Sequence, residues 1–387
     1  MSKKIRLGII GLGAEGDMYA NFLQEARVEN MEIGAICDIL PEKKEQADEY
    51  GVPFYSDYKE LITSGEVDAI VTTVPHYLHP EMGIFALENN IHALVEKPVG
   101  VYTKQANELI EFANSKPELK FGVFFNQRTN QLYKDLKDIM DSGELGKLRH
   151  TSWIITTWWR PQGYYNQSDW RATWGGEGGG VLVNQAPHQL DLWQWICGTP
   201  EKVFARNAYG FRRDIAVEDE VHALVAFPDG ASGAFVTCTH DMIGTDRLEI
   251  LCDKGKIVVD DSKKVTISRL VENEEVLSQN MNMDDVKKLF TGQLDMAQYL
   301  TVETKEYESV WGEQHCEVMR NFAAAINGEE ELLAPGSDGI NGVQLANGIH
   351  LSSWTCQEVD LVNFDEATYL EELNKRIEAE GKFEVRN

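Results

Sequence analysis

The segment Ile5–Ala20, IRLGIIGLGAEGDMYA, places three glycines between an apolar run and an amphipathic stretch. The spacing Gly11-x-Gly13-x-x-Gly16 predicts a strand, a tight turn and a helix. Gly11 permits the turn, Gly13 lets a pyrophosphate approach the backbone, and Gly16 lets the helix pack on the strand. The first turn of such a helix offers free N–H groups and a positive dipole to phosphates. The segment therefore predicts a dinucleotide-binding turn.

An acidic residue follows the second apolar run. Asp38 directly follows the stretch Ile33–Cys37 and lies 22 residues after Gly16. An acid at this position accepts hydrogen bonds from both ribose hydroxyls of a dinucleotide. The same carboxylate repels a 2′-phosphate, so NAD is favoured over NADP as the cofactor. The alternative is a Rossmann fold that binds a different nucleotide or none.

The pattern of the chain changes near Arg128. Before it, short apolar runs alternate with amphipathic stretches, which predicts βα units and a doubly wound parallel sheet. After it, strands dominate: Asp219–His240 is a hairpin turned at Pro228-Asp229-Gly230, and Asp246–Leu270 continues the meander. We expect α/β plus α+β architecture: a Rossmann dinucleotide-binding domain over 1–127, and an α+β substrate-binding and oligomerisation domain over 128–387 built on an open antiparallel sheet.

Composition excludes several classes of function. The chain has 387 residues and a formal net charge of −27, which repels phosphate backbones and argues against a nucleic-acid partner. Its six cysteines form no CxxC pair and no Cys/His cluster, so we expect no metal site and reduced thiols. No apolar run reaches about 18 residues, so we expect no membrane span. The N-terminus indicates a first strand and not a signal peptide. The scattered reduced thiols indicate a cytoplasmic location.

Two segments carry side chains suited to proton transfer. Ala93–Gly100, ALVEKPVG, ends a predicted strand at Lys97, and ligands bind outside the carboxyl ends of such strands. In Gly178–Trp195, GGGVLVNQAPHQLDLWQW, three glycines lead into an apolar strand, and Pro187 begins a helix. His188 near that N-terminus should be neutral, with Asp191 on the same face to orient its ring. The alternatives are a solvated lysine and a packed helix histidine.

The combined pattern resembles the glucose–fructose oxidoreductase / inositol dehydrogenase / MocA family. The elements that carry the resemblance are Gly11-x-Gly13-x-x-Gly16, Asp38, Pro75…His79, Glu96-Lys97-Pro98, Trp170-Arg171, Gly178-Gly179-Gly180 and His188-x-x-Asp191. The resemblance implies NAD(P)-dependent oxidation of a carbinol on a sugar or cyclitol. It implies that Lys97 binds the reacting hydroxyl and that His188 is the general base or acid. Both roles suit the chemistry, because the hydroxyl must lose a proton and its alkoxide needs a nearby cation.

Two positions depart from the family pattern. Many members have an aspartate where this chain has Asn184, and an amide cannot accept a proton. Proton transfer should then fall to His188 and Lys97 alone. His76 stands where asparagine is common, which puts a specific asparagine contact to the nucleotide in doubt.

Aromatic residues gather before the predicted catalytic helix, within Trp153–Trp174. Aromatic faces pack on the C–H faces of sugars, although core packing is the alternative for any one of them. We expect a carbohydrate or cyclitol as substrate. The expected substrate-binding residues are Trp158, Arg160, Tyr165, Trp170, Arg171, Asn184, Asp191 and His240. The expected cofactor-binding residues are Gly11, Gly13, Ala14, Glu15, Gly16, Asp38, Val74, Pro75, His79, Glu96, Lys97 and Asn126.

Three functions remain open on this basis. The first is an NAD-dependent dehydrogenase that oxidises a secondary hydroxyl of a sugar, a glycoside (at pyranose C3, for example) or an inositol. The second is a glycoside hydrolase or lyase that oxidises the sugar transiently and recruits Tyr165 or His240 as an additional base. The third is a non-catalytic NAD-binding regulator, against which Lys97 and His188 argue. The family and the open sheet predict a homodimer or homotetramer.

Overall fold

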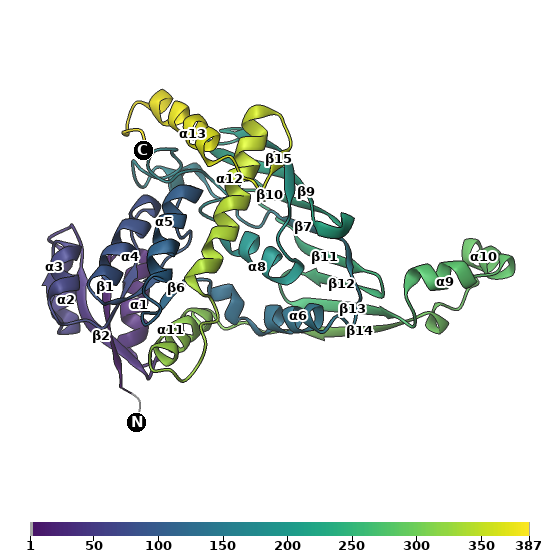
Figure 1. The fold of residues 1–387 in the computed structure, drawn as a ribbon, viewed down its shortest axis with the longest axis horizontal. Coiled ribbons are helices and arrows are strands. Elements are labelled where there is room, and N and C mark those ends of the chain that lie inside the picture. Colours follow the sequence, from purple (N-terminus) through teal and green to yellow (C-terminus); the bar gives the residue numbers. More distant parts are fainter. Residues whose placement is uncertain (1–2, 387) are drawn as a thin grey trace.

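The computed structural model describes residues 3–386 and contains two sheets side by side (Figure 1). The first sheet is entirely parallel, with strand order β3-β2-β1-β4-β5-β6, as the alternating pattern predicts for a Rossmann fold. Its strands are β1 (Ile5–Ile10), β2 (Met31–Cys37), β3 (Phe54–Tyr55), β4 (Ala69–Thr72), β5 (His92–Val95) and β6 (Phe121–Val123).

Helices cover the first sheet on both faces, which explains why its central strands are apolar without alternation. These helices are α1 (Ala14–Gln24), α2 (Lys43–Tyr50), α3 (Tyr58–Thr63), α4 (His79–Glu88) and α5 (Thr103–Asn114). In β1, Leu7 and Ile9 are completely buried on one face, and Ile10 packs into a separate cluster on the other.

The second sheet has the order β14-β13-β12-β11-β7-β10-β9-β8-β15, and the predicted hairpin is its β9–β10 pair. The sheet is mostly antiparallel, as expected, with one parallel pair, β7 and β10. The strands β10 and β11 run in opposite directions with β7 between them, so β7 must be parallel to one of the two. The strands are β7 (Leu148–Ile155), β8 (Lys202–Tyr209), β9 (Glu218–Ala226), β10 (Ser232–Cys238), β11 (Asp246–Cys252), β12 (Gly255–Asp260), β13 (Lys264–Leu270), β14 (Leu300–Glu306) and β15 (Val359–Asp360).

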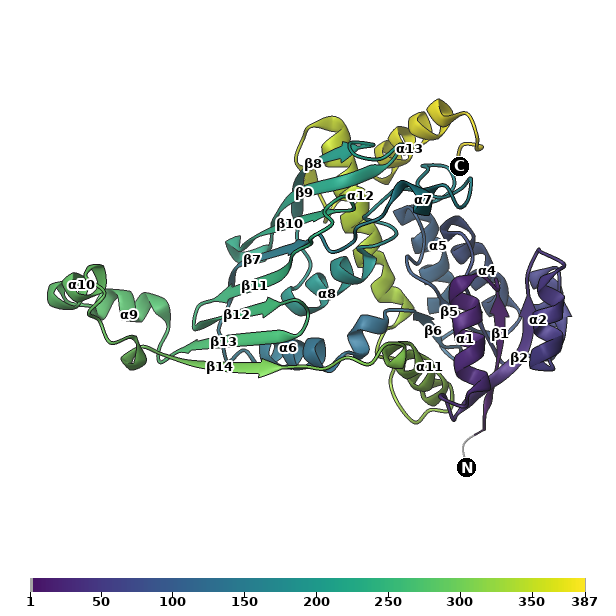
Figure 2. The ribbon, with the colours of Figure 1, turned by 180° about the vertical axis from the view of Figure 1, so that it is seen from behind.

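One face of this sheet packs on α6 (Gln131–Ser142), α8 (Pro187–Cys197) and α12 (Gly339–Thr355), while no helix of residues 3–386 covers the other face (Figure 2). The core between them contains the fully buried rings of Trp153 and Trp193. The short α7 (Gln162–Tyr165) and the closing α13 (Glu366–Glu380) lie at the end nearest the first domain.

The helix α11 (Glu313–Ile326) belongs to the first domain in space although it follows the second sheet in sequence. Its residues Met319 and Phe322 are buried in one cluster with Leu7 and Ile9 of β1. A segment that follows the second sheet in sequence therefore packs on the first sheet. A single boundary at residue 127 separates the two domains in sequence but does not separate them in space.

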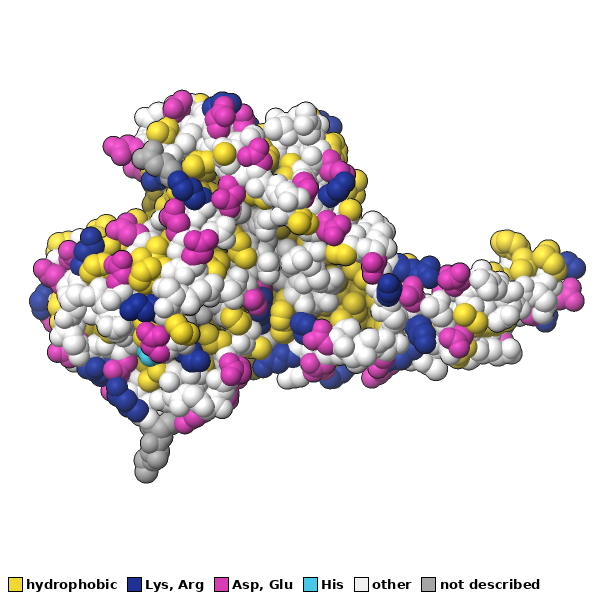
Figure 3. Space-filling view, viewed as in Figure 1, with side chains coloured by type: hydrophobic (Ala, Val, Ile, Leu, Met, Phe, Trp, Pro, Cys, Tyr) yellow, Lys and Arg dark blue, Asp and Glu magenta, His cyan; other side chains and the backbone are white. Residues whose placement is uncertain are grey.

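An arm made of α9 (Glu274–Asn280) and α10 (Met283–Phe290) projects between β13 and β14. Apolar side chains gather at its tip (Figure 3), where Met283 is 68% and Phe290 83% exposed. The sequence reasoning did not anticipate this arm. Among the described helices, none is both long and apolar enough to cross a membrane.

Candidate active site

The glycine-rich turn between β1 and α1 has a separate steric reason for each glycine. Gly11 has φ +94°, and a Cβ there would overlap the carbonyl oxygen of Thr73. A Cβ on Gly16 would overlap the carbonyl oxygen of Gly11, so helix and turn touch only because this residue has no side chain. By contrast, a Cβ on Gly13 would meet no atom within 4 Å. Gly13 thus leaves open space above the helix N-terminus, as a bound pyrophosphate requires.

Asp38 is fixed beside the turn by backbone amides. Its Oδ2 accepts a hydrogen bond from Leu12 N at 2.7 Å, and its Oδ1 accepts one from Leu40 N at 2.9 Å. The side chain is only partly buried, and no salt bridge of the described residues neutralises it. A fixed, unpaired carboxylate at the end of β2 fits the ribose hydroxyls of NAD and disfavours a 2′-phosphate.

A cavity of about 440 Å³ opens at the carboxyl ends of β4 and β5, next to this turn. Open α/β sheets bind ligands at this edge. Of the expected residues, the cavity wall contains Gly13, Ala14, Glu15, Val74, Pro75, His79, Glu96, Lys97, Trp170, Arg171 and Asn184. It also contains Thr73, His76, Tyr164 and Gln167, which the sequence reasoning did not select.

Lys97 and Glu96 have different roles in this wall. The Nζ of Lys97 donates to the carbonyl oxygen of Asn184 at 3.1 Å, which links the first domain to the glycine segment of the second. Glu96 is only 5% exposed and accepts hydrogen bonds from Tyr19 Oη and from the backbone N–H of Lys97. Burial, followed by the charge of Glu15, raises the pKa of Glu96 to about 8.

Two of the expected cofactor residues direct their polar atoms into the protein. Both ring nitrogens of His79 face carbonyl oxygens, of Pro98 at 2.8 Å and of Val74 at 2.9 Å, so its ring reaches the cavity without a free polar atom. Asn126 does not line the cavity: its Nδ2 lies 2.7 Å from Nε2 of His315 on α11. No pattern in the sequence indicates that α11 returns to this position.

His188 is partly exposed but is not among the residues that line the cavity, and its ring packs edge-on against Phe125. Burial and the charge of Lys97 lower its pKa well below the usual value, so the ring is neutral, as expected at a helix N-terminus. The expected orienting contact is wrong: Asp191 is paired with Arg128, and Nδ1 of His188 is enclosed without a hydrogen-bond partner within residues 3–386. Asp191 is also too deeply buried for the substrate contact predicted for it.

The segment Gly178–Gly180 leads into turns, which corrects the predicted apolar strand. Its glycines allow close packing on the protein itself: a Cβ on Gly178 would overlap Val101, and one on Gly180 would overlap the backbone of Glu218. The carboxylate of Glu218 accepts hydrogen bonds from Gly180 N at 2.9 Å and Leu182 N at 3.0 Å. The amides that a strand would pair are therefore bound by one buried side chain.

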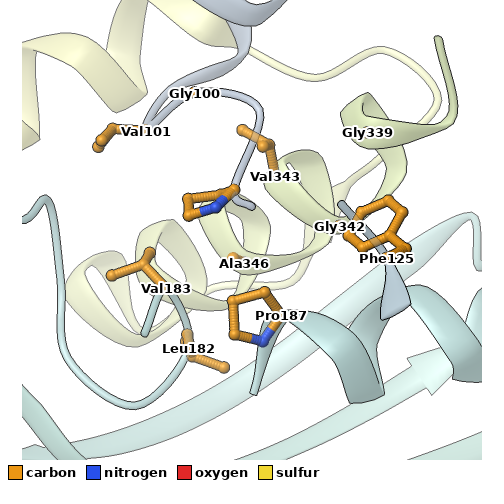
Figure 4. Close-up of a pocket in the computed structure, with 11 residues that line it drawn as sticks. Gly100, Val101, Phe125, Leu182, Val183, Pro187, Gly339, Gly342, Val343 and Ala346 are labelled. Atoms are coloured by element: carbon orange, nitrogen blue, oxygen red, sulfur yellow. The ribbon is translucent and has the colours of Figure 1, made fainter. Parts of the chain in front are cut away.

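Apolar side chains close the space behind this loop (Figure 4). Val101, Leu182, Val183 and Pro187 face Val343 and Ala346 of α12 across a gap of about 10 Å³. Because this volume is about that of one water probe, the gap is a packing contact that fixes the loop, with no room for a ligand.

The amide at Asn184 has a carboxylate beside it after all. Its Nδ2 donates to Glu177, which is 1% exposed and whose pKa is raised by burial. Its Oδ1 accepts from Gln185 Nε2 at 2.7 Å and from Tyr164 Oη at 3.3 Å, and Tyr164 Oη in turn accepts from Arg171 at 2.6 Å. Sequence reasoning missed Glu177 because seven positions separate it from Asn184 across irregular backbone.

Four other expected substrate residues do not line this cavity. Tyr165 is buried in the core of the second domain, where Trp158 also packs. Arg160 stacks over Tyr164 and donates to the carbonyl of Trp159. The Nε2 of His240 bonds to Glu220 at 2.7 Å. Of the neighbouring Tyr164 and Tyr165, only Tyr164 lines this cavity. A helix of four residues is too short for its periodicity to predict which of the two faces the cavity.

Within the described part of the chain, no group of three or more His, Cys, Asp or Glu is placed to hold a metal ion. The six cysteines form no disulfide.

Residues 5–125 match the family model described as an oxidoreductase family with an NAD-binding Rossmann fold, and residues 133–258 match the GFO/IDH/MocA C-terminal domain. The myo-inositol 2-dehydrogenase of Thermotoga maritima is 28% identical over 273 residues, covering 68% of this chain and 77% of that protein. An uncharacterized oxidoreductase of Bacillus subtilis is 27% identical over 359 residues, covering 91% and 95%. The fold is similar to levoglucosan dehydrogenase in complex with NADH, with a TM-score of 0.78 at 19% identity over 93% and 99% of the two chains.

Proposed function

The chain belongs to the GFO/IDH/MocA oxidoreductase family and is an NAD-dependent oxidoreductase, and from this premise we propose that it oxidises a secondary hydroxyl of a cyclic polyol. The substrate class is a sugar, a glycoside or an inositol. One observation carries the proposal: the ammonium group of Lys97 and the open turn at Gly13 line the same cavity. A ligand in this cavity would therefore meet a fixed cation beside the cofactor turn.

NAD, when bound, supplies a nicotinamide ring that accepts a hydride from the carbinol carbon. The open turn at Gly13 and the anchored carboxylate of Asp38 would hold its pyrophosphate and ribose. Lys97 would bind the reacting hydroxyl and stabilise the alkoxide as the proton leaves, because an ammonium interacts most strongly with the charged form. The Asn184 carbonyl holds this ammonium in place.

We assign proton acceptance to His188. Its imidazole is neutral because burial and the Lys97 charge disfavour the imidazolium, and a neutral ring can take a proton. His188 does not line the cavity, so the proton would reach it by a short relay or a small movement of the loop.

The composition of the cavity supports a carbohydrate or cyclitol. Trp170 offers an apolar face, while Arg171, Tyr164 and Gln167 offer hydrogen-bonding groups around it. Rings that carry many hydroxyls present this combination of apolar C–H faces and polar edges. The similar proteins named as inositol and levoglucosan dehydrogenases act on compounds of this kind.

The transient-oxidation hydrolase receives less support. The two additional bases considered for it, Tyr165 and His240, both lie outside the cavity. The hypothesis of a non-catalytic regulator is disfavoured because Lys97, the residue expected to bind the reacting hydroxyl, lines the cavity.

A panel of pyranoses, glycosides and inositols, each with NAD and with NADP, tests the proposal through the absorbance of the reduced cofactor. We expect net reduction of NAD by at least one cyclic polyol and a clear preference over NADP. Cleavage of a glycoside without net reduction of NAD would favour the hydrolase instead. Preference for NADP would overturn the role given to Asp38.

A further inference from the structure

His76 is a polar residue of the cavity wall to which the proposed chemistry gives no task. It begins the short helix His76–Leu78 directly after Pro75, at the carboxyl end of β4. His76 is only 8% exposed although it lines the cavity, so little bulk water solvates its ring. A buried polar ring needs hydrogen-bond partners for both nitrogens, and the protein supplies one.

That one partner fixes the tautomer of the ring. Nδ1 of His76 lies 3.1 Å from the backbone carbonyl oxygen of Glu177. A carbonyl oxygen only accepts, so Nδ1 must carry the proton and donate it. Burial, followed by the charges of His79 and Lys97, lowers the pKa of His76 well below the usual value. The ring is therefore neutral, with its proton on Nδ1 and a lone pair on Nε2.

The lone pair on Nε2 is available to a ligand. Within residues 3–386, Nε2 has no hydrogen-bond partner, and it is not among the polar atoms that are sealed without one, so it opens to the cavity. Trp170 restricts the ring by edge-to-face packing at 6.3 Å between centroids. The acceptor thus has a fixed direction beside the apolar face expected to carry a sugar ring.

Three other polar groups of the cavity cannot replace this acceptor. Lys97 and Arg171 only donate hydrogen bonds. The Oδ1 of Asn184 already accepts from Gln185 and Tyr164. A polyhydroxylated ring brings several O–H donors and would need a neutral acceptor on the Trp170 side of the cavity.

We propose that Nε2 of His76 accepts a hydrogen bond from a substrate hydroxyl other than the one oxidised, which makes His76 a specificity-determining residue. The inference rests on the proposed function and refines it: the substrate must carry a second hydroxyl within reach of His76 while the first meets Lys97. Because Glu177 comes from the second domain and His76 from the first, the contact forms only when the domains are correctly packed.

The test compares His76→Phe, which keeps a ring without an acceptor, with His76→Gln, which offers a carbonyl oxygen. For His76→Phe we expect the substrate KM to rise about ten- to hundredfold, as for a buried donor left unpaired, with kcat changed less than about threefold. NAD affinity, measured by calorimetry, should stay unchanged, and His76→Gln should recover part of the loss. His150→Phe, at an exposed position of β7 outside the cavity, is the matched control and should behave like the unmodified protein.

Deoxy analogues locate the hydroxyl. One analogue should bind the unmodified protein as weakly as the parent compound binds His76→Phe, and that substitution should weaken it no further. The same calorimetric comparison in NADH-loaded Lys97→Met protein measures the contact without turnover, so a failure of the proposed catalysis remains distinguishable. An unchanged substrate affinity in His76→Phe, or a loss confined to NAD binding, would overturn the proposal.

Discussion

Asp191 and Arg128 form a buried ion pair, with Oδ1 2.6 Å from Nη2 and Oδ2 2.9 Å from Nε, and each side chain is 2% exposed. Arg128 also reaches Asp338 at 2.6 Å, so it joins α8 to the short helix Gly336–Asp338 before α12. The aspartate of the His188-x-x-Asp191 pattern therefore anchors α8 through Arg128 and does not hydrogen-bond to the ring of His188.

Asp191→Ala should accordingly lower the free energy of unfolding by about 3 kcal/mol, because it removes the buried partner of the Arg128 guanidinium and leaves only the partly exposed Asp338 to compensate its charge. Denaturant titration measures this change. Asp48→Ala, which removes the exposed pair with Lys44, is the control and should change stability by less than about 1 kcal/mol. A loss of kcat with stability unchanged would instead favour the orienting role first expected for Asp191.

Glu96 should make stability depend on pH in the direction opposite to that of a carboxylate whose pKa is lowered by folding. Its pKa in the folded protein is about 8, against an ordinary value of 4.5, so the folded state binds more protons than the unfolded state between these limits. Stability is then fully present below pH 4.5 and is lost as the pH rises toward 8, by at most about 1.4 kcal/mol per pH unit. Melting temperatures of the unmodified protein and of Glu96→Gln over this range provide the measurement, and equal slopes would contradict the prediction.

The sequence predicted what depends on local spacing. The glycine turn, the order of βα units and the hairpin at Pro228-Asp229-Gly230 follow from contacts within a few tens of residues. Contacts between segments that local patterns do not link were not predictable. These are the packing of α11 on the first sheet, the hydrogen bond between Asn184 and Glu177, and the ion pair between Arg128 and Asp191. The arm of α9 and α10 was also not predicted. Its charged, amphipathic sequence is the same as that of a helix packed on a domain, so the sequence does not show that the arm projects from the fold.

The glycines of the cofactor turn should separate folding from binding. Gly16→Ala should destabilise the protein by about 1–3 kcal/mol, since its methyl group would overlap the Gly11 carbonyl. Gly13→Ala should leave the melting temperature nearly unchanged, because its methyl group meets no protein atom within 4 Å. It should nevertheless weaken NAD binding by occupying space that the pyrophosphate needs. Calorimetry of NAD with both variants tests this contrast, and tight binding by Gly13→Ala would place the pyrophosphate elsewhere.

Lys97→Met should lower kcat by about a thousandfold or more, because it removes the cation that stabilises the alkoxide. NAD affinity should persist, since the cofactor turn is untouched. Lys104→Met on α5 removes an exposed ammonium away from the cavity and should retain activity. Steady-state kinetics with the best substrate of the panel decides the matter: if kcat fell less than tenfold, Lys97 would have no part in the chemistry.

Asn184 should resist the aspartate that is common in the family at this position. Its Nδ2 donates to Glu177, so Asn184→Asp would set a second carboxylate against a buried one. We expect a loss of about 1–3 kcal/mol near neutral pH, from the lost donor and the like charges. One proton shared by the two carboxylates would relieve the repulsion, and the folded state would bind it more tightly than the unfolded state. The stability of Asn184→Asp should therefore recover as the pH falls.

Combining Asn184→Asp with Glu177→Gln should restore stability at neutral pH. The glutamine oxygen can still accept from Ala172 N, which donates to Glu177 at 2.6 Å, while its amide donates to the new carboxylate. Melting temperatures of the two single variants and the double variant, each across pH, form a double-mutant cycle with a positive coupling energy. Additive losses would show that the two side chains do not interact. A fully stable Asn184→Asp would show that this chain tolerates the carboxylate and that Glu177 does not account for its replacement by an amide.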